Sequence, residues 1–393
     1  MSWIHRLRER LRPPADPTYG LVLSGGGARS AYQAGVLQYI GEHYPDAVFP
    51  VLTGVSAGAI NAAHLANFTK SFAEATHALM ETWTGVEQGD IIHSQGTLTF
   101  LRRMLPWGGK GEVQHIDAMR HTNEGLIDNR PLRDFLTRVL GAEADGTLSG
   151  IAENLEAGRL KACALIALSY TTGQTVSWIQ GCEVETWERP NRVSVNTQIT
   201  VEHIMASAAL PFLFPAVRVD NAWYGDGGIR LTAPLSPAIH MGANRLIAVS
   251  TRYPRTRAEA SVPEITGYPP TAQIVGQLMN AIFLDTLEQD IFMTERMNQM
   301  LQHVPRREWD GMEPLRLLLI RPSRDVGRMA SDYQLNISGV LGMLTRGLGS
   351  DETKSPDWLS MLLFDPAYMT ALAEIGYTDA KAQRDEIARF FAD

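Results

Sequence analysis

The sequence is poor in the residues that build disulfide frameworks and metal centres. It has only two cysteines, Cys163 and Cys182, and they lack the spacing of metal ligands. Its ten histidines are scattered and include no H-E-x-x-H pair. Cys163 lies in an apolar run, where a buried thiol is expected. We therefore expect neither a metal site nor a cofactor, and nothing in the sequence demands an oxidising compartment.

Basic tracts and long hydrophobic runs are also missing. The formal net charge is −8 with no compensating basic stretch, which argues against a nucleic-acid partner. No run approaches the roughly 18 apolar residues of a membrane span. Residues 1–12 lack the continuous apolar segment of a secretory signal. Together these features predict a cytoplasmic protein.

Two short segments are candidates for peripheral contact with a membrane. Residues 3–12 place apolar side chains at helical spacing between arginines, and Pro13-Pro14 ends the pattern. Residues 98–107 are apolar and basic, and a glycine-rich stretch follows them. The alternative in each case is a helix that packs against the rest of the protein.

Apolar strands alternate with helical stretches through Ser250. The apolar content of 45% is enough for a sizeable core. Strands separated by helices predict an α/β fold with a mainly parallel central sheet covered by helices on both faces. The expected strands are at residues 19–24, 51–52, 160–170, 174–179 and 245–250, with a hairpin at 217–224.

The pattern changes after Thr251. Residues 253–270 have the composition of a linker, and the spacing in 274–304 predicts one long amphipathic helix. A strand is expected at 315–320, and the tail from Ser355 looks helical. The sequence therefore predicts a largely helical C-terminal extension.

The stretch Gly54-Val55-Ser56-Ala57-Gly58 has the pattern of a nucleophile elbow. It follows an apolar run and opens into a helix-forming stretch, which is the strand, turn and helix context that G-x-S-x-G requires. The turn is so tight that side chains in place of Gly54 or Gly58 would collide with the strand or the helix. Ser56 is therefore a candidate nucleophile with an outward-facing hydroxyl.

A second glycine-rich turn, residues 25–29 (GGGAR), joins the first strand to a helical stretch. Backbone N–H groups at such a turn lie beside the positive end of the helix dipole and suit an anion. A dinucleotide fingerprint fails because its sixth position is Ser30, and no Gly-Lys-Ser/Thr follows for a P-loop. The remaining interpretation is an oxyanion hole for Ser56.

A serine hydroxyl needs a neighbouring base, which can be a histidine oriented by an acid or a carboxylate acting directly. Asp226 stands between glycines at the end of a predicted strand. Only His240 and His303 follow it, and neither has a motif around it. A Ser–Asp dyad is therefore the leading arrangement, with a conventional triad as the alternative.

Taken in order, three stretches resemble the patatin-like phospholipases. They are GGGARSAYQAG from Gly25, GVSAG from Gly54, and ASAALPFLFP from Ala206, which precedes the DGG that begins at Asp226. The resemblance covers roughly residues 19–252. Any one of these motifs is weak, but the ordered set, each at its own strand end, is specific.

The resemblance implies a three-layer α/β/α fold and a lipid or acyl-ester substrate. It implies Ser56 as nucleophile and Asp226 as base, followed by the motif residues Gly227 and Gly228. It also implies an oxyanion loop in which Arg29 supports four backbone donors, those of Gly25, Gly26, Gly27 and Ala28. One departure is residues 230–234 (RLTAP), which replace the Asn-Pro often found after the base. This departure bears on local geometry more than on the base itself.

The expected organisation has three parts. Residues 1–18 form a basic amphipathic segment, residues 19–252 a patatin-like catalytic domain, and residues 253–393 a mostly helical region packed on that domain. Two alternatives to a lipid acyl hydrolase stay open. One is a thioesterase or small-ester esterase that uses the same residues, and the other is a catalytically idle binding module recruited to a membrane. The oligomeric state is left open.

Overall fold

The computed structural model describes residues 17–92, 128–211, 213–262, 268, 271–283, 286–309, 312–336 and 357–392. The segments 3–12 and 98–107, the two candidates for peripheral membrane contact, lie outside these ranges, so both interpretations of them stay predictions. Within the described ranges, no helix combines the length and the apolar character that crossing a membrane would require.

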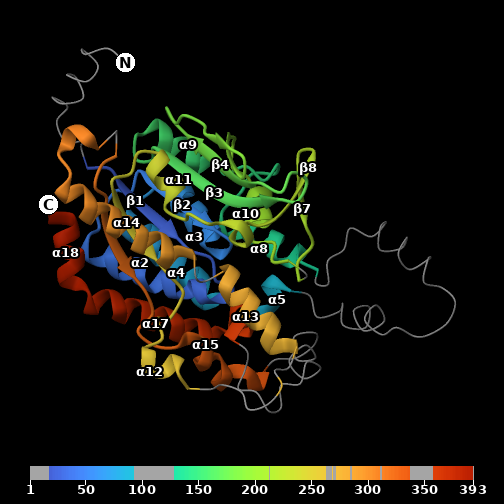
Figure 1. Cartoon of the computed structure of the whole chain (residues 1–393). Helices are drawn as coiled ribbons and strands as arrows, with labels where there is room; N and C mark the ends of the chain where they lie inside the picture. The colour runs from blue at the N-terminus through green and yellow to red at the C-terminus, as the bar shows by residue number, and fades with distance from the viewer. Residues whose placement is uncertain are drawn as a thin grey trace.

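A ten-stranded sheet forms the centre of the molecule (Figure 1). Its order is β10-β9-β1-β2-β3-β4-β6-β5, and β8 pairs with both β3 and β7. The strands from β10 to β3 run parallel, whereas β4 and β8 run antiparallel to β3. The bounds are β1 Tyr19–Leu23, β2 Val51–Val55, β3 Ala162–Ser169, β4 Thr175–Gly181, β5 Glu188–Arg189, β6 Arg192–Asn196, β7 Val217–Val219, β8 Ala222–Asp226, β9 Arg245–Val249 and β10 Arg316–Ile320.

Helices cover both faces of this sheet, as the sequence predicts. Because side chains alternate along a strand, Leu21 and Leu23 of β1 join one core cluster while Val22 joins another. The first cluster includes residues of α2 (Ala31–His43), α3 (Ala57–Asn67), α4 (Phe72–Gly85) and α17 (Pro366–Ala382). The second includes residues of α11 (Ser236–His240) and α14 (Thr286–His303). The expected mainly parallel sheet within a three-layer α/β/α arrangement is confirmed.

The described residues form further helices besides these. The α-helices are α5 Gln88–Ile91, α8 Arg130–Val139, α9 Ser149–Glu156, α10 Val201–Ser207, α12 Arg257–Ala260, α13 Thr271–Phe283, α15 Val326–Met329 and α18 Arg384–Ala392. The 3-10 helices are η1 Gly27–Ser30, η3 Gly227–Arg230, η4 Arg306–Glu308, η5 Ala330–Asn336 and η6 Asp357–Leu362.

The helix predicted for residues 274–304 agrees with α13 and α14, which are helical up to Phe283 and again from Thr286. Residues 284–285 between them lie outside the described residues, so a single continuous helix stays a prediction. Phe283, at the end of α13, packs close to Gly228 beside η3. Leu287 and Ile291 of α14 instead join the core on one face of the sheet. Apolar residues have helical spacing in both α13 and α14. The spacing alone therefore does not show that the two helices contact different parts of the protein.

The chain beyond residue 252 shares the sheet and the core with the residues before it. β10 pairs in register with β9, and Figure 1 shows α17, near the C-terminus, lying along α2. The hydroxyl of Tyr32 in α2 donates a buried hydrogen bond of 3.1 Å to Asp379 in α17. The proposed division after residue 252 therefore falls within one continuous sheet.

Candidate active site

Ser56 occupies the sharp turn between β2 and α3. Its φ of 56° and ψ of −131° form a conformation that residues other than glycine rarely adopt. Such strain persists only where the surroundings dictate it. Here the N–H of Ser56 donates to the hydroxyl of Ser207 at 3.0 Å, and that hydroxyl donates to the carbonyl of Ile166 at 2.6 Å. Ser207, on α10, thus connects the strained turn to Ile166 in the neighbouring strand β3.

The two glycines that flank Ser56 are required by close backbone contacts. A Cβ atom on Gly54 would lie 2.2 Å from the carbonyl oxygen of Gly58. A Cβ atom on Gly58 would lie 2.2 Å from the carbonyl oxygen of Leu23 in β1. Real Cβ contacts do not occur at such distances, so a larger residue at either position would displace the strand, the helix or the turn.

The glycine loop after β1 lies directly beside Ser56. A Cβ atom on Gly25 would be 3.0 Å from the Cβ and 3.6 Å from the hydroxyl oxygen of Ser56. Gly27 has a φ of 56°, in the left-handed region that favours glycine. From Gly27 the chain turns into η1, which contains Ala28 and Arg29 and leads into α2. The loop and the serine are therefore adjacent at the carboxyl ends of β1 and β2.

Side chains that sequence reasoning missed hold the glycine loop. The carbonyl of Gly25 accepts a 2.7 Å hydrogen bond from the hydroxyl of Thr251, and Gln33 donates to the carbonyl of Ser24 at 2.8 Å. Arg29 is buried, and its Nε donates to the hydroxyl of Ser360 at 2.6 Å. Thr251 and Ser360 stand far from the glycine loop in the sequence, so the pattern of glycines does not reveal them.

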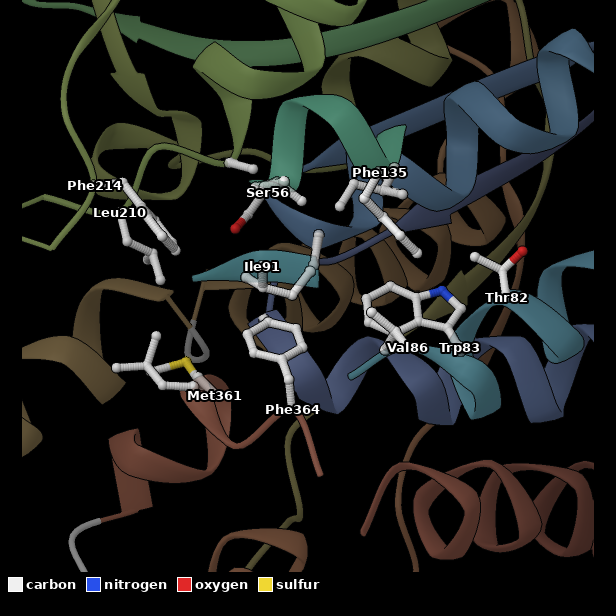
Figure 2. A pocket seen from close by; sticks show the side chains of 16 residues that line it. Ser56, Thr82, Trp83, Val86, Ile91, Phe135, Leu210, Phe214, Met361 and Phe364 are labelled. Atoms are coloured by element: carbon white, nitrogen blue, oxygen red, sulfur yellow. The ribbon is translucent and has the colours of Figure 1, made fainter. Parts of the chain in front are cut away.

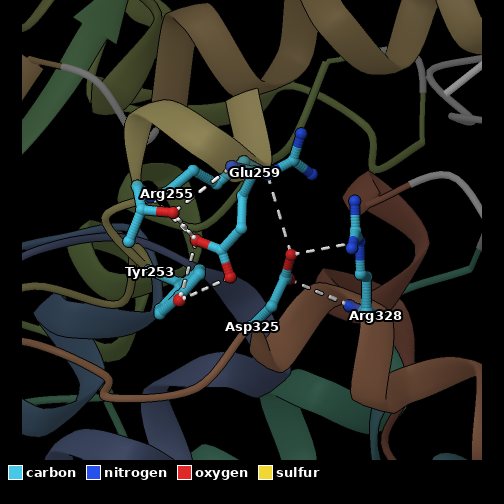
Figure 3. A network of polar contacts seen from close by, with 6 residues as sticks. Tyr253, Arg255, Glu259, Asp325 and Arg328 are labelled. Atoms are coloured by element: carbon cyan, nitrogen blue, oxygen red, sulfur yellow. Dashed lines mark hydrogen bonds and ion pairs between the residues drawn. The ribbon is translucent and has the colours of Figure 1, made fainter. Parts of the chain in front are cut away.

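Polar contacts also secure the chain just after Thr251 (Figure 3). The Tyr253 hydroxyl donates to Glu259 at 3.0 Å, and Thr256 caps the start of α12. Arg255 and Arg328 both pair with Asp325, at 3.7 and 3.4 Å. Because these ion pairs are partly exposed, each is worth little by itself. Their shared carboxylate nevertheless ties the segment after β9 to α15.

Asp226 lies at the same end of the sheet as Ser56. In the register, Val55 pairs with Ile166 and Asp226 pairs with Ala167, so β3 separates the two candidate residues by one strand. Asp226 is fully buried, and its Oδ1 accepts a 2.8 Å hydrogen bond from the N–H of Gly228. Its Oδ2 is also buried and accepts no hydrogen bond from the described residues.

The surroundings of Asp226 change its acidity. Burial raises the pKa of this carboxyl to about 7, while the Ser56 hydroxyl and the Gly228 N–H act in the opposite direction. The Ser56 hydroxyl thus lies close enough to interact with the carboxylate without forming a well-aligned hydrogen bond. Loose contacts of this kind are common in active sites without substrate. The following glycine also has no room for a side chain, since a Cβ atom on Gly227 would lie 2.3 Å from the Ile166 carbonyl oxygen.

The two histidines considered as alternative bases have other surroundings. His240 is exposed on α11, where its ring contacts Ser236 and stacks near Trp187. His303 is exposed at the end of α14. Among the described histidines, none of the hydrogen bonds found reaches Ser56 or Asp226.

An apolar pocket opens at Ser56. Its described lining is apolar apart from Ser56 itself, the hydroxyl of Thr82 and the indole N–H of Trp83, which already donates to Asn61 at 2.6 Å. Figure 2 shows the Ser56 side chain among the apolar side chains. Its walls come from several helices and loops, with Ile60, Leu132, Phe135, Leu210 and Phe214 among the lining residues.

Residues 21–239 match the family model described as patatin-like phospholipase, which covers more than half of the chain. The chain belongs to the patatin-like phospholipase family. This is a family of lipid-hydrolysing enzymes, and the glycine loop and both candidate residues lie within the matched segment. No curated protein sequence matches the chain.

Solved structures show more distant similarity. VipD from Legionella pneumophila is 14% identical with a TM-score of 0.40, and the match covers 95% of this chain and 67% of VipD. Human GIVD cytosolic phospholipase A2 is 12% identical with a TM-score of 0.46, and the match covers 98% of this chain. The chain spans 62% of the length of that human phospholipase chain.

Part of the site lies beyond the segment that matches the patatin-like phospholipase family. Thr251, which holds Gly25, and Ser360, which contacts Arg29, both follow residue 239. The pocket residues Met361 and Phe364 do so as well. The surroundings of the candidate site are therefore completed by residues outside the segment that matches the family model.

Proposed function

We propose that the protein is a serine acyl hydrolase that cleaves fatty-acyl esters of phospholipids or related lipids through a Ser56–Asp226 dyad and an acyl-enzyme. The observation that carries the proposal is the combination of a strained serine with a buried carboxylate, one strand away, at the opening of an apolar pocket. A nucleophile, a base and a site for an acyl chain are thus available together.

In the first half of the proposed reaction, the Ser56 hydroxyl oxygen attacks the ester carbonyl while Asp226 accepts its proton. The developing oxyanion accepts hydrogen bonds from backbone N–H groups of the loop Gly25–Ala28. The buried Arg29, which donates to Ser360, stabilises this loop. The protonated Asp226 then donates to the leaving alcohol or lysolipid. In the second half, Asp226 accepts a proton from water as the water attacks the acyl-enzyme. The bond between the acyl carbon and the Ser56 oxygen then breaks, Asp226 returns the proton to that oxygen, and the fatty acid is released.

The acidity of Asp226 suits this role. A pKa of about 7 leaves a large fraction of the carboxyl ionised at neutral pH, yet makes it a much stronger base than an exposed aspartate. The buried Oδ2, which accepts no hydrogen bond from the described residues, is available to accept the proton of Ser56.

A fluorophosphonate probe tests the proposed nucleophile. Because these probes react only with activated serines, we expect labelling of the native protein at Ser56 and none in Ser56→Ala. A lipid-product profile on mixed phospholipid vesicles then identifies the bond cleaved. Absence of labelling in a folded native protein would contradict an acyl hydrolase and favour the idle binding module.

The glycine loop gives a prediction on turnover. A Cβ atom on Gly27 would lie 2.0 Å from the Met361 carbonyl oxygen, and one on Gly26 would lie 2.5 Å from the Thr251 hydroxyl oxygen. Gly26→Ala or Gly27→Ala must therefore displace the loop and misalign its backbone N–H donors. We expect kcat to fall by roughly two to three orders of magnitude in either variant. The measurement is ester turnover by each variant.

Gly141→Ala is a matched control for Gly27→Ala. Gly141 has a φ of 58°, against 56° for Gly27, but a Cβ atom there meets no atom within 4 Å. The control therefore carries the same backbone strain without the collision, and it should keep nearly normal turnover. If Gly27→Ala were as active as Gly141→Ala, the loop would have no part in the mechanism.

The pH dependence of hydrolysis gives a further prediction. Only ionised Asp226 can accept the proton of Ser56, so kcat/KM should fall as the pH decreases through about 7. We expect a slope of about tenfold per pH unit on the acidic side, as for a single protonation. A profile that stays level down to pH values near 5, in folded protein, would exclude a base with this pKa.

A further inference from the structure

A short C-terminal segment, Ser360–Phe364, forms one wall of the pocket at Ser56. Met361, Leu362 and Phe364 line the same pocket as Ser56, and all three are buried. Figure 2 shows Met361 and Phe364 on the side of the pocket opposite Phe135. This wall belongs to a part of the chain more than a hundred residues beyond the family match, which ends at residue 239.

The wall is joined to the glycine loop by two contacts. The buried guanidinium of Arg29 donates to the Ser360 hydroxyl at 2.6 Å, and Ser360 is itself fully buried. The main chain of Met361 packs so closely on Gly27 that no Cβ atom fits between them. The segment is therefore held in place by the same loop that we propose as the oxyanion hole.

The other end of the wall is fixed by α17. Asp365 directly follows Phe364 and caps this helix by accepting 3.0 Å hydrogen bonds from the N–H groups of Ala367 and Tyr368. The Tyr368 hydroxyl donates to the carbonyl of Val326 at 2.9 Å. Phe364 is thus placed between two anchored positions, and its ring has little freedom to leave the pocket.

We propose that this wall sets the acyl-chain selectivity of the enzyme, with Phe364 and Met361 as the specificity-determining residues. The inference rests on the proposed function, in which the pocket holds the acyl chain of the ester. Binding of an acyl chain in such a pocket is driven by burial of its methylene groups, so its usable length depends on the side chains that close the pocket. A large, fixed phenyl ring excludes volume that a longer or bent chain would need.

Paired substitutions at Phe364 test the proposal. Phe364→Ala opens the wall, and Phe364→Trp fills it further. With p-nitrophenyl esters from butanoyl to palmitoyl, we expect the kcat/KM ratio of long to short chains to rise by at least about tenfold in Phe364→Ala. The ratio should fall in Phe364→Trp. Met361→Ala should change it in the same direction as Phe364→Ala.

Phe390→Ala is the matched control, because it also removes a buried phenyl ring from the C-terminal region. Phe390 packs edge-on against Tyr19 with ring centroids 5.7 Å apart, and it does not line the pocket. Any general loosening should appear in both alanine variants as a lower melting temperature. Only Phe364→Ala should change the chain-length ratio.

Opposite shifts in the alanine and tryptophan variants, with no shift in Phe390→Ala, would support the proposal. An unchanged ratio in folded Phe364→Ala and Phe364→Trp would overturn it. Should Phe364→Ala fail to fold, Phe364→Trp and Met361→Ala decide the matter in the same assay. The proposed function fails in a different way, since Ser56→Ala would then leave hydrolysis intact at every chain length.

Discussion

Replacement of Ser56 by alanine should reduce ester hydrolysis to below about 1% of the native rate, because no other group of the proposed mechanism can form the acyl-enzyme. The fold should be unaffected. Alanine meets the same backbone strain as serine at a φ of 56°, and the N–H of residue 56 can still donate to the Ser207 hydroxyl. The measurement is turnover of a short-chain p-nitrophenyl ester together with the melting temperature.

Ser207→Ala is an informative companion to this variant. It removes the hydroxyl that holds the N–H of Ser56 and contacts the Ile166 carbonyl, but it leaves the nucleophile in place. We expect lower stability and a partial loss of activity, since the strained turn loses one of its supports.

Activity of Ser56→Ala above about 1% in a correctly folded protein would mean that the nucleophile lies elsewhere.

Asp226→Asn should be nearly as damaging as Ser56→Ala, because an amide of the same shape cannot accept a proton. Residues that act as one unit show non-additive losses, so the Ser56→Ala/Asp226→Asn double variant should be little worse than either single variant. His240→Ala and His303→Ala should each keep most of the activity, since both side chains are exposed on other elements. An inactive but folded histidine variant, with Asp226→Asn still active, would replace the dyad by a triad.

The same substitution has a predicted effect on stability that separates misfolding from lost chemistry. The pKa of Asp226 is about 7 in the folded protein, whereas an aspartate in an unfolded chain has a value of about 3.9. The native protein therefore loses stability as the pH rises from about 4 to about 7, because folding keeps a carboxylate buried. Asparagine does not titrate.

Asp226→Asn should therefore gain stability relative to the native protein as the pH rises. Between pH 5 and pH 8 we expect a relative gain of roughly 2 to 3 kcal/mol in the free energy of unfolding. Urea denaturation at the two pH values measures it. An equal difference between the proteins at both values would show that Asp226 is not held at a raised pKa.

The positions of the nucleophile elbow, the glycine loop and the strand that ends at Asp226 could be predicted from the sequence because the signals are local. A nucleophile elbow needs glycines two residues before and after the serine, and the contacts of Gly54 and Gly58 lie within the same strand, turn and helix or in the adjacent strand. Asp226 ends a strand that its alternating pattern reveals, and the hairpin of β7 and β8 follows the prediction. The mainly parallel sheet likewise follows from alternating strands and helices.

Only the tertiary structure decided what surrounds those motifs. Thr251 and Gly25 are 226 positions apart, and Arg29 and Ser360 are 331 positions apart, so no local pattern records either contact. The burial that raises the pKa of Asp226, the apolar pocket and its wall at Phe364 likewise arise from packing between distant segments. Local backbone sterics place the serine, the glycine loop and the carboxylate at strand ends, whereas long-range packing determines the acidity of the carboxylate, the support of the loop and the shape of the pocket beside Ser56.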